Sequence, residues 1–179
     1  MKTIVLFGDS MLARFTKARI DELQRRCHGH MVLNCAAGGF TSNDGVVRAA
    51  IVAKMQPDVV VLSFGANDSA PDRLVELNVF DSNISSIVAA FSGAAIFGFL
   101  PPSVLEIDGI GPRGRTNRVL AEYRDVLRTA VPPSHAVDID ATLAPLILAG
   151  TAVHEDGLHL NDAAYALAIA ALAERITAV

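Results

Sequence analysis

Short runs of branched and aromatic apolar residues recur along this chain, and most are followed by a longer segment with helical spacing. The run at Asp58–Phe64 (DVVVLSF) constrains the fold most, because its consecutive apolar residues would be buried on both faces. Burial on both faces is typical of a central strand in a parallel sheet. We expect five strands in all, at Thr3–Phe7, Met31–Ala36, Asp58–Phe64, Ala94–Leu100 and His135–Ile139.

The segments between and after these runs predict helices. Their apolar residues recur three or four positions apart, which gives a helix one buried face. Alternation of strand and helix predicts an α/β fold, with a parallel sheet covered by helices on both sides. No repeat or low-complexity tract divides the chain, so we expect a single domain over residues 1–179. The expected helices are Met11–Arg26, Val46–Met55, Val79–Phe91, Thr116–Ala130 and Asn161–Ile176.

Composition excludes several classes of protein. Apolar residues make up 51% of the chain and charged residues 19%, which argues against a disordered segment. Nineteen acidic residues against 15 Lys and Arg leave a formal charge of −4, so a broad basic face for nucleic acid is not expected. The expected partner is a small molecule, and the composition leaves the oligomeric state open.

The sequence also lacks an obvious membrane segment. Its longest apolar stretch, Ile87–Leu100, is shorter than the roughly 20 residues of a spanning helix, and so predicts buried core. The apolar run Ile4–Phe7 is shorter than the roughly 7–15 residues of a signal-peptide core. The expected location is therefore cytoplasmic.

Polar residues cluster directly after the predicted strands and before the last helix. Carboxyl ends of parallel strands lie along one edge of a sheet, so these groups should face one crevice. Together they supply a hydroxyl, a glycine-rich turn, a carboxamide, a carboxylate and an imidazole, which are the parts of an acyl-transfer site. The segments are Gly8–Ser10, Ala37–Thr41, Gly65–Asp68 and Asp156–His159.

Ser10 is the candidate nucleophile, because a serine that starts a helix just past a strand is exposed at the crevice. His159 is the candidate base, since imidazole can take the serine proton near neutral pH and later return it. Asp156 lies three residues earlier, where a tight turn lets its carboxylate orient the imidazole. His154 is a rival base, but its spacing from Asp156 fits less well.

Three groups could bind the oxyanion of a tetrahedral intermediate. They are the backbone N–H of Ser10, the backbone N–H of Gly39 and the side-chain amide of Asn67. Glycine lets the backbone approach a substrate without an intervening Cβ atom. Asp9 and Asp68 are interpreted as structural residues that brace their loops.

Four motifs together resemble the SGNH hydrolases of the GDSL esterase/lipase superfamily. They are GDS at Gly8–Ser10, NCAAGGFTS at Asn34–Ser42, GAND at Gly65–Asp68 and DGLH at Asp156–His159. The resemblance implies a three-layer α/β/α flavodoxin-like fold with a five-stranded parallel sheet. It also implies the roles given above for Ser10, Gly39, Asn67, Asp156 and His159, with no metal and no cofactor.

The chain departs from the superfamily pattern at two places. Met11 follows the nucleophile where the superfamily often has Leu or Ile, and Ala36 stands where a glycine is common. Gly39, rather than Gly38, aligns with the oxyanion glycine. These departures remove no catalytic group, but they alter the surroundings of the acyl group.

The expected function is a serine esterase that hydrolyses carboxylic esters, with short acyl groups such as acetyl, through an acyl-enzyme at Ser10. Met11, Phe40, Pro101 and the rest of the loop to Gly114 are the expected walls of the cleft. A thioesterase, lysophospholipase, carbohydrate deacetylase or acyltransferase could use the same residues. A non-catalytic flavodoxin-like binding module is the more distant alternative.

Three other patterns predict no separate function. Gly109–Gly114 matches GxGxxG by letter, but it follows a proline-containing loop rather than the first strand, so it predicts a loop beside the acyl pocket or a lid. Arg113, Arg115 and Arg118 predict a solvated face, with grip on an anionic substrate as the alternative. No metal site is expected, because the following group lacks zinc-ligand spacing: Cys27, His28, His30 and Cys35.

Overall fold

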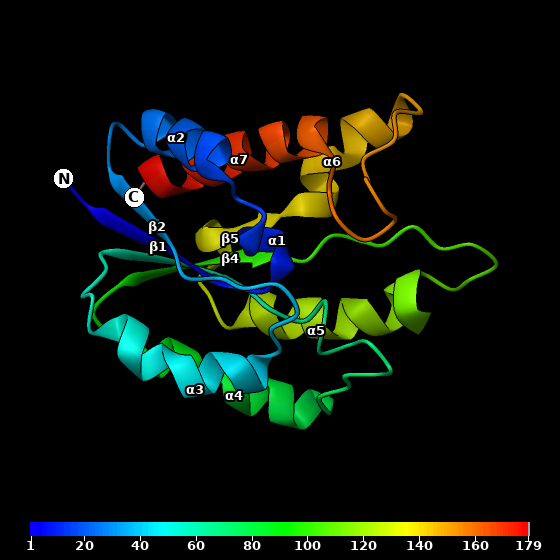
Figure 1. Ribbon diagram of the computed structural model, residues 1–179, viewed down its shortest axis with the longest axis horizontal. Coiled ribbons are helices and arrows are strands. Elements are labelled where there is room, and N and C mark those ends of the chain that lie inside the picture. Colours follow the sequence, from blue (N-terminus) through cyan, green and yellow to red (C-terminus); the bar gives the residue numbers. More distant parts are fainter. Residues whose placement is uncertain (179) are drawn as a thin grey trace.

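The computed structural model describes residues 1–178, and in that range it contains one five-stranded parallel sheet (Figure 1). The strand order is β2-β1-β3-β4-β5, with the strand predicted to be central in the middle. This is the doubly wound flavodoxin-like order, and it confirms the predicted fold class. The strands are β1 (Thr3–Gly8), β2 (Met31–Asn34), β3 (Val59–Ser63), β4 (Ala95–Leu100) and β5 (Ala136–Asp138).

Helices cover both faces of the sheet (Figure 1). One layer holds α2 (Lys17–Arg26), α6 (Ile139–Leu148) and α7 (Asp162–Thr177). The opposite layer holds α3 (Ser42–Ala53), α4 (Leu77–Ala90) and α5 (Asn117–Thr129). Three short elements complete the described chain: α1 (Ser10–Ala13) at the end of β1, and two 3-10 turns, η1 (Pro112–Gly114) and η2 (Pro133–His135).

The pleat of each strand divides the core into two apolar clusters. In β1, Ile4 and Leu6 join the cluster beneath α2 and α7, whereas Val5 and Phe7 join the cluster beneath α3 and α4. Alternate residues of a strand point to opposite faces, so a strand buried on both sides must be apolar throughout. Every residue of β3 is buried, as its sequence predicts.

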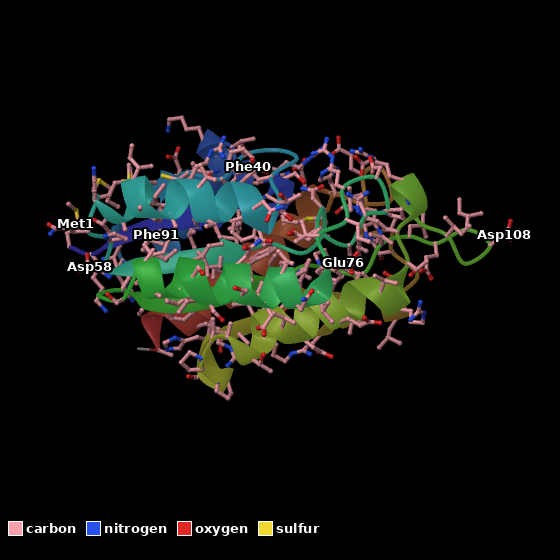
Figure 2. All side chains as sticks on the ribbon, turned by 90° about the horizontal axis from the view of Figure 1, so that it is seen from below. Met1, Phe40, Asp58, Glu76, Phe91 and Asp108 are labelled. Carbon is pink, nitrogen blue, oxygen red and sulfur yellow. The ribbon has the colours of Figure 1, made fainter. Side chains whose placement is uncertain are left out.

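The carboxyl ends of the strands lie at one end of the molecule. In Figure 2, Met1, Asp58 and Phe91 mark the opposite end, while Asp108 lies at the tip of a loop that projects beyond the carboxyl ends. A short antiparallel bridge between Ile107 and Ile110 makes this loop a narrow hairpin. Any site formed by the loops after the strands therefore lies beside this hairpin.

The predicted helix Met11–Arg26 is wrong, because the structure divides it into α1 and α2. The chain turns at Phe15, whose ring is buried in the core. The Asn34 side chain donates hydrogen bonds to the carbonyl oxygens of Leu12 (2.9 Å) and Phe15 (3.3 Å). A contact from a distant strand thus satisfies carbonyl groups that a continuous helix would have bonded internally.

Helix α6 is an element that the sequence analysis missed. Asp138 ends β5 and caps α6 directly, since its carboxylate accepts a hydrogen bond from Ala141 N–H at 3.0 Å. Pro145 lies inside this helix, and a proline within a segment disfavours a helix prediction from the sequence.

The apolar segment Ile87–Leu100 forms the end of α4, a turn and β4. Within residues 1–178, no helix has the length and apolar character needed to cross a membrane.

Candidate active site

The turn after β1 fixes the position of Ser10. A Cβ atom on Gly8 would lie 2.1 Å from the carbonyl oxygen of Ser63, so only glycine allows β1 and β3 to approach this closely. Asp9 N–H donates to the same Ser63 oxygen at 2.9 Å. The Asp9 carboxylate accepts from Met11 N–H at 2.9 Å and caps α1. Ser10 is therefore the first residue of a short helix at the carboxyl edge of the sheet.

Ser10, His159 and Asp156 form a continuous hydrogen-bonded chain. Ser10 Oγ lies 2.9 Å from His159 Nε2, and His159 Nδ1 lies 2.7 Å from Asp156 Oδ2. Because a carboxylate only accepts, Nδ1 carries the proton and Nε2 is free to accept from the serine hydroxyl. The arrangement can move a proton from Ser10 to His159 while a negative charge faces the ring.

Asp156 also organises the turn that carries the imidazole. Its other oxygen accepts from the backbone N–H groups of Leu158 (3.0 Å) and His159 (2.7 Å). Partial burial alone would raise the pKa of Asp156, but hydrogen bonds from His159 and Leu158 outweigh it and hold the pKa well below its usual range. The carboxylate is therefore ionised at neutral pH.

Arg14 is a cleft residue that the sequence analysis did not select. Its guanidinium pairs with Glu155 at 2.7 Å and lies 3.7 Å from Asp156 Oδ2. Arg14 follows Ser10 by four residues, which places it one helical turn away on the same side. That spacing was the available signal, and the pairing links α1 to the segment that carries His159.

The three expected oxyanion donors line one cleft of about 490 Å³, together with Ser10 and His159. Asn67 is almost fully buried, at 5% exposure, yet it reaches the cleft wall. Within residues 1–178, the backbone N–H groups of Ser10 and Gly39 donate to no protein acceptor. Donors that reach a cleft and lack an internal partner are available to a substrate oxygen.

Gly39 adopts a backbone conformation that favours glycine, with φ of +80°. Arg73 Nη1 donates to the Gly39 carbonyl oxygen at 2.7 Å, which fixes the peptide plane on that side. Arg73 carried no signal in the sequence, because it lies 34 residues from Gly39 in a separate loop. Gly38, in contrast, has no positive φ.

The two buried aspartates brace the site, as expected. Asp68 accepts from Ser42 N–H at 2.7 Å and from Gly65 N–H at 3.0 Å, and so joins the start of α3 to the turn after β3. Asp9 is fully buried, and burial raises its pKa to about 7. Among residues 1–178, its Oδ2 atom has no hydrogen-bond partner.

The expected cleft walls need correction. Met11 is fully buried in the core beneath α2 and α7, because the first turn of α1 directs it inward. Pro101 is buried, and Phe40 packs under the Arg48 guanidinium at 4.2 Å. None of these three lines the cleft. Besides Ser10, His159 and the donors, its walls are Ala13, Arg14, Gly38, Pro112, Arg113, Arg115, Asp156 and Leu158.

The arginine cluster does not form one solvated face. Arg118 is exposed and pairs with Glu122, and Arg113 is half-exposed and pairs with Asp72. Arg115 is only 1% exposed, so the prediction is wrong for this residue. Its side chain turns inward toward the loop after β3, a contact that no local pattern reveals.

The other histidine and cysteine candidates lie apart from Ser10. His154 Nε2 bonds to the Ser103 carbonyl oxygen at 2.9 Å rather than to the serine hydroxyl. Cys27 is buried and Cys35 is half-buried, and neither forms a disulfide. In the described range 1–178, no group of three or more His, Cys, Asp or Glu side chains is placed to hold a metal ion.

Solved structures that share this fold include a lipase/acylhydrolase and two esterases. A lipase/acylhydrolase from Enterococcus faecalis superposes with a TM-score of 0.86 at 24% identity, over 99% of this chain and 96% of that one. A catalytic mutant of an acetylxylan esterase from Geobacillus stearothermophilus gives 0.78 at 18% identity, over 98% and 94%. A carbohydrate acetylesterase from Sinorhizobium meliloti gives 0.76 at 14% identity, over 99% of both chains.

The sequence itself matches the profile of the GDSL-like lipase/acylhydrolase family over residues 6–167. The chain therefore belongs to that family, and the resemblance drawn from its four motifs is confirmed. A search of curated proteins gives no match for this sequence.

Proposed function

We propose that this protein is a serine esterase that hydrolyses carboxylic esters through a covalent acyl-enzyme at Ser10. The observation that carries the proposal is the hydrogen-bonded chain from Ser10 Oγ through His159 to Asp156, with distances of 2.9 and 2.7 Å. A serine hydroxyl is a weak nucleophile until a neighbouring base accepts its proton. Membership of a hydrolase family favours this function over the flavodoxin-like binding module.

In the first half-reaction, His159 takes the proton of Ser10 as the serine oxygen attacks the ester carbonyl. The carbonyl oxygen becomes an oxyanion, which accepts from Ser10 N–H, Gly39 N–H and the Asn67 amide. The intermediate collapses, the alcohol leaves with the proton from His159, and Ser10 remains acylated. Water then repeats these steps and releases the carboxylic acid.

We infer acetyl or similarly short acyl groups as the substrate class. The cleft beside Ser10 is small, at about 490 Å³, and open to solvent. Two of the structural neighbours are named as acetyl esterases of carbohydrate substrates, which supports the same class here. Polar and charged groups on the cleft wall, such as Arg14 and Arg113, suit an alcohol that carries hydroxyl groups.

A second candidate is an ester or thioester with a longer apolar group. A neighbouring cavity of about 590 Å³ shares Pro112 and Asp156 with the cleft and is lined by three exposed apolar side chains of the hairpin, Leu105, Ile107 and Ile110. Such a surface beside Ser10 could hold a hydrocarbon chain.

Hydrolysis of p-nitrophenyl acetate, butyrate and octanoate by the wild type, Ser10→Ala and His159→Ala tests the proposal. We expect the acetate to be the best substrate, and both variants to lose about 10⁴-fold or more of kcat/KM. His154→Gln is the matched histidine control and should keep most of the activity. A fluorophosphonate should label the wild type at Ser10.

Activity that survives in Ser10→Ala would contradict the proposal. Loss of activity in His154→Gln but not in His159→Ala would reassign the base. A preference for octanoate that falls in Ile107→Ser or Ile110→Ser would favour the second candidate.

A further inference from the structure

Arg115 is a buried cation at the wall of the cleft. Its side chain is only 1% exposed, although the residue lies in the loop between β4 and α5. Within residues 1–178 it forms no salt bridge with a carboxylate, unlike Arg113, which pairs with Asp72. Burial lowers the pKa of Arg115, but a guanidinium remains protonated at neutral pH. A buried, unpaired charge is costly unless its donors are satisfied.

Three neutral oxygens accept hydrogen bonds from this guanidinium. Nε donates to the Ala66 carbonyl at 2.6 Å and Nη1 to the Pro112 carbonyl at 3.0 Å. Nη2 donates to the side-chain oxygen of Asn67 at 3.0 Å. Two of the three acceptors therefore belong to the turn that carries the expected oxyanion donor.

These contacts define the orientation of the Asn67 carboxamide. Its oxygen must face Arg115, because a guanidinium can only donate. Its nitrogen must face the Phe40 carbonyl oxygen, which lies 2.9 Å away and can only accept. One amide hydrogen is used by Phe40, and the second is left for an acceptor in the cleft. If the carboxamide were rotated by 180°, its NH₂ group would face the donor Arg115 and its oxygen would face the acceptor oxygen of Phe40.

The charge also acts on the amide electronically. A cation bonded to a carbonyl oxygen draws electron density from the amide nitrogen, which makes its N–H a stronger donor. Because the Arg115 guanidinium is buried, its positive charge is less screened by water than a surface charge would be. Arg115 is therefore placed to assist the donor through its hydrogen bond to the Asn67 carboxamide.

We propose that Arg115 is a positioning residue for catalysis, which holds Asn67 and polarises its amide toward the oxyanion of the reacting ester. The inference rests on the proposed esterase function. A purely structural role is the competing explanation, since the same side chain also joins the loop at Pro112 to the turn at Ala66. The two explanations predict different effects of Arg115→Gln on kcat when Asn67 has already been replaced by alanine.

A double-mutant cycle separates them. We measure kcat and KM for p-nitrophenyl acetate in wild type, Arg115→Gln, Asn67→Ala and the double variant, with Ser10→Ala in the same assay. We expect Arg115→Gln to lower kcat by about 10- to 100-fold with little change in KM, and to lower it by less than about threefold when Asn67 is already Ala. Arg118→Gln is the matched control, because among residues 1–178 that exposed arginine pairs with Glu122 alone, and it should match the wild type.

Equal fold-losses in both backgrounds, a loss confined to KM, or no loss would overturn the proposal. If Arg115→Gln does not fold by circular dichroism, Arg115→Lys replaces it in the cycle, since it keeps the charge and is expected to retain more of kcat. As a readout without substrate, the Asn67 side-chain amide protons, assigned by their absence in Asn67→Ala, should move upfield in the Arg115 variant. Unchanged amide shifts would also overturn the proposal. Residual activity in Ser10→Ala would instead refute the esterase function itself.

Discussion

The candidate site has two halves that are built in different ways: an oxyanion half around Asn67, and a base half formed by the turn Asp156–His159. The oxyanion half is deep in the protein, where Asp9, Asn67, Asp68 and Arg115 are all buried. The base half lies at the surface, where the Asp156 side chain is 47% exposed. The hydrogen bonds of Asp156 join residues two or three positions apart, whereas Arg115 and Asn67 meet across 48 positions of sequence.

Because of this difference, we expect substitutions in the two halves to affect activity and the free energy of unfolding differently. A short turn such as Asp156–His159 keeps its geometry through local bonds, and exposed charge pairs add little to the free energy of unfolding. Buried polar groups must be bonded, so removing one partner leaves another unsatisfied. We therefore expect substitutions in the base half to lower activity alone, and those in the oxyanion half to lower activity and stability together.

The largest effect on activity with the smallest effect on folding is expected for Asp156→Asn. Loss of the carboxylate removes the preferred imidazole tautomer, so kcat should fall by about 10⁴-fold. The pKa of Asp156 is lower in the folded protein than in the unfolded chain. Its ionised carboxylate therefore stabilises the fold when the pH is above the unfolded-chain pKa, and this contribution is lost as pH falls below about 4. At pH 7 this contribution is present and the variant loses it, but the loss should be below about 1 kcal/mol in urea unfolding, because the side chain is 47% exposed and the asparagine oxygen can still accept from the backbone N–H groups. A large loss of stability there would contradict the proposed separation.

Asn67→Ala should lower both activity and stability. Loss of one oxyanion donor costs about 10²- to 10³-fold in kcat. The same change strips Arg115 of an acceptor, so the free energy of unfolding should fall by about 1–3 kcal/mol. Asn83→Ala is the matched control, because within residues 1–178 its half-buried amide donates to Ser42 Oγ and Asn43 Oδ1 and accepts nothing from Arg115. A kinetic loss with unchanged unfolding would show that the network is not stabilising.

Asp9→Asn tests the buried half through pH. The pKa of Asp9 is about 7 in the folded protein, above its ordinary value, so the folded state binds more protons between about pH 4 and 7. Stability from this group is present at low pH and is lost as pH rises, by about 2 kcal/mol between pH 5 and 7. Asp9→Asn should flatten this decline, measured by urea unfolding at pH 5, 6 and 7. Exposed Asp81→Asn should leave the slope unchanged, and an unchanged slope in Asp9→Asn would refute the assignment.

Gly39→Ala should have the smallest effect of the four. Its φ of +80° is unfavourable for alanine, and a Cβ atom would lie 2.8 Å from Arg73 Nη1, the end of a flexible side chain. We expect about 1 kcal/mol of destabilisation and about a tenfold loss of kcat/KM. Gly38→Ala meets nothing within 4 Å and should cost less. The reverse order would make Gly38 the oxyanion glycine.

The sequence predicted the elements whose signals are local. Apolar runs located all five strands, and the signal was strongest for β1, β3 and β4, which are buried on both faces along most of their length. The break between α1 and α2 was missed because it depends on Asn34, which reaches it from β2. Helix α6 was missed because Pro145 is tolerated within it. The first error arises where a tertiary contact overrides a local preference, and the second where a helix accommodates a residue that disfavours it.

The same division holds for the candidate site. The motifs alone selected Ser10, Asn67, Asp156 and His159, because the carboxyl ends of parallel strands must share one edge and each motif follows a strand or precedes the last helix. Only the tertiary structure turned Met11 into the core, and it brought Arg73 and Arg115 to the backbone and amide groups expected to bind the oxyanion. Side-chain direction on a loop depends on what packs against it, and the chain carries no periodic signal for that. The candidate reacting groups could therefore be selected from the sequence, whereas the contacts that orient them depend on how the chain folds.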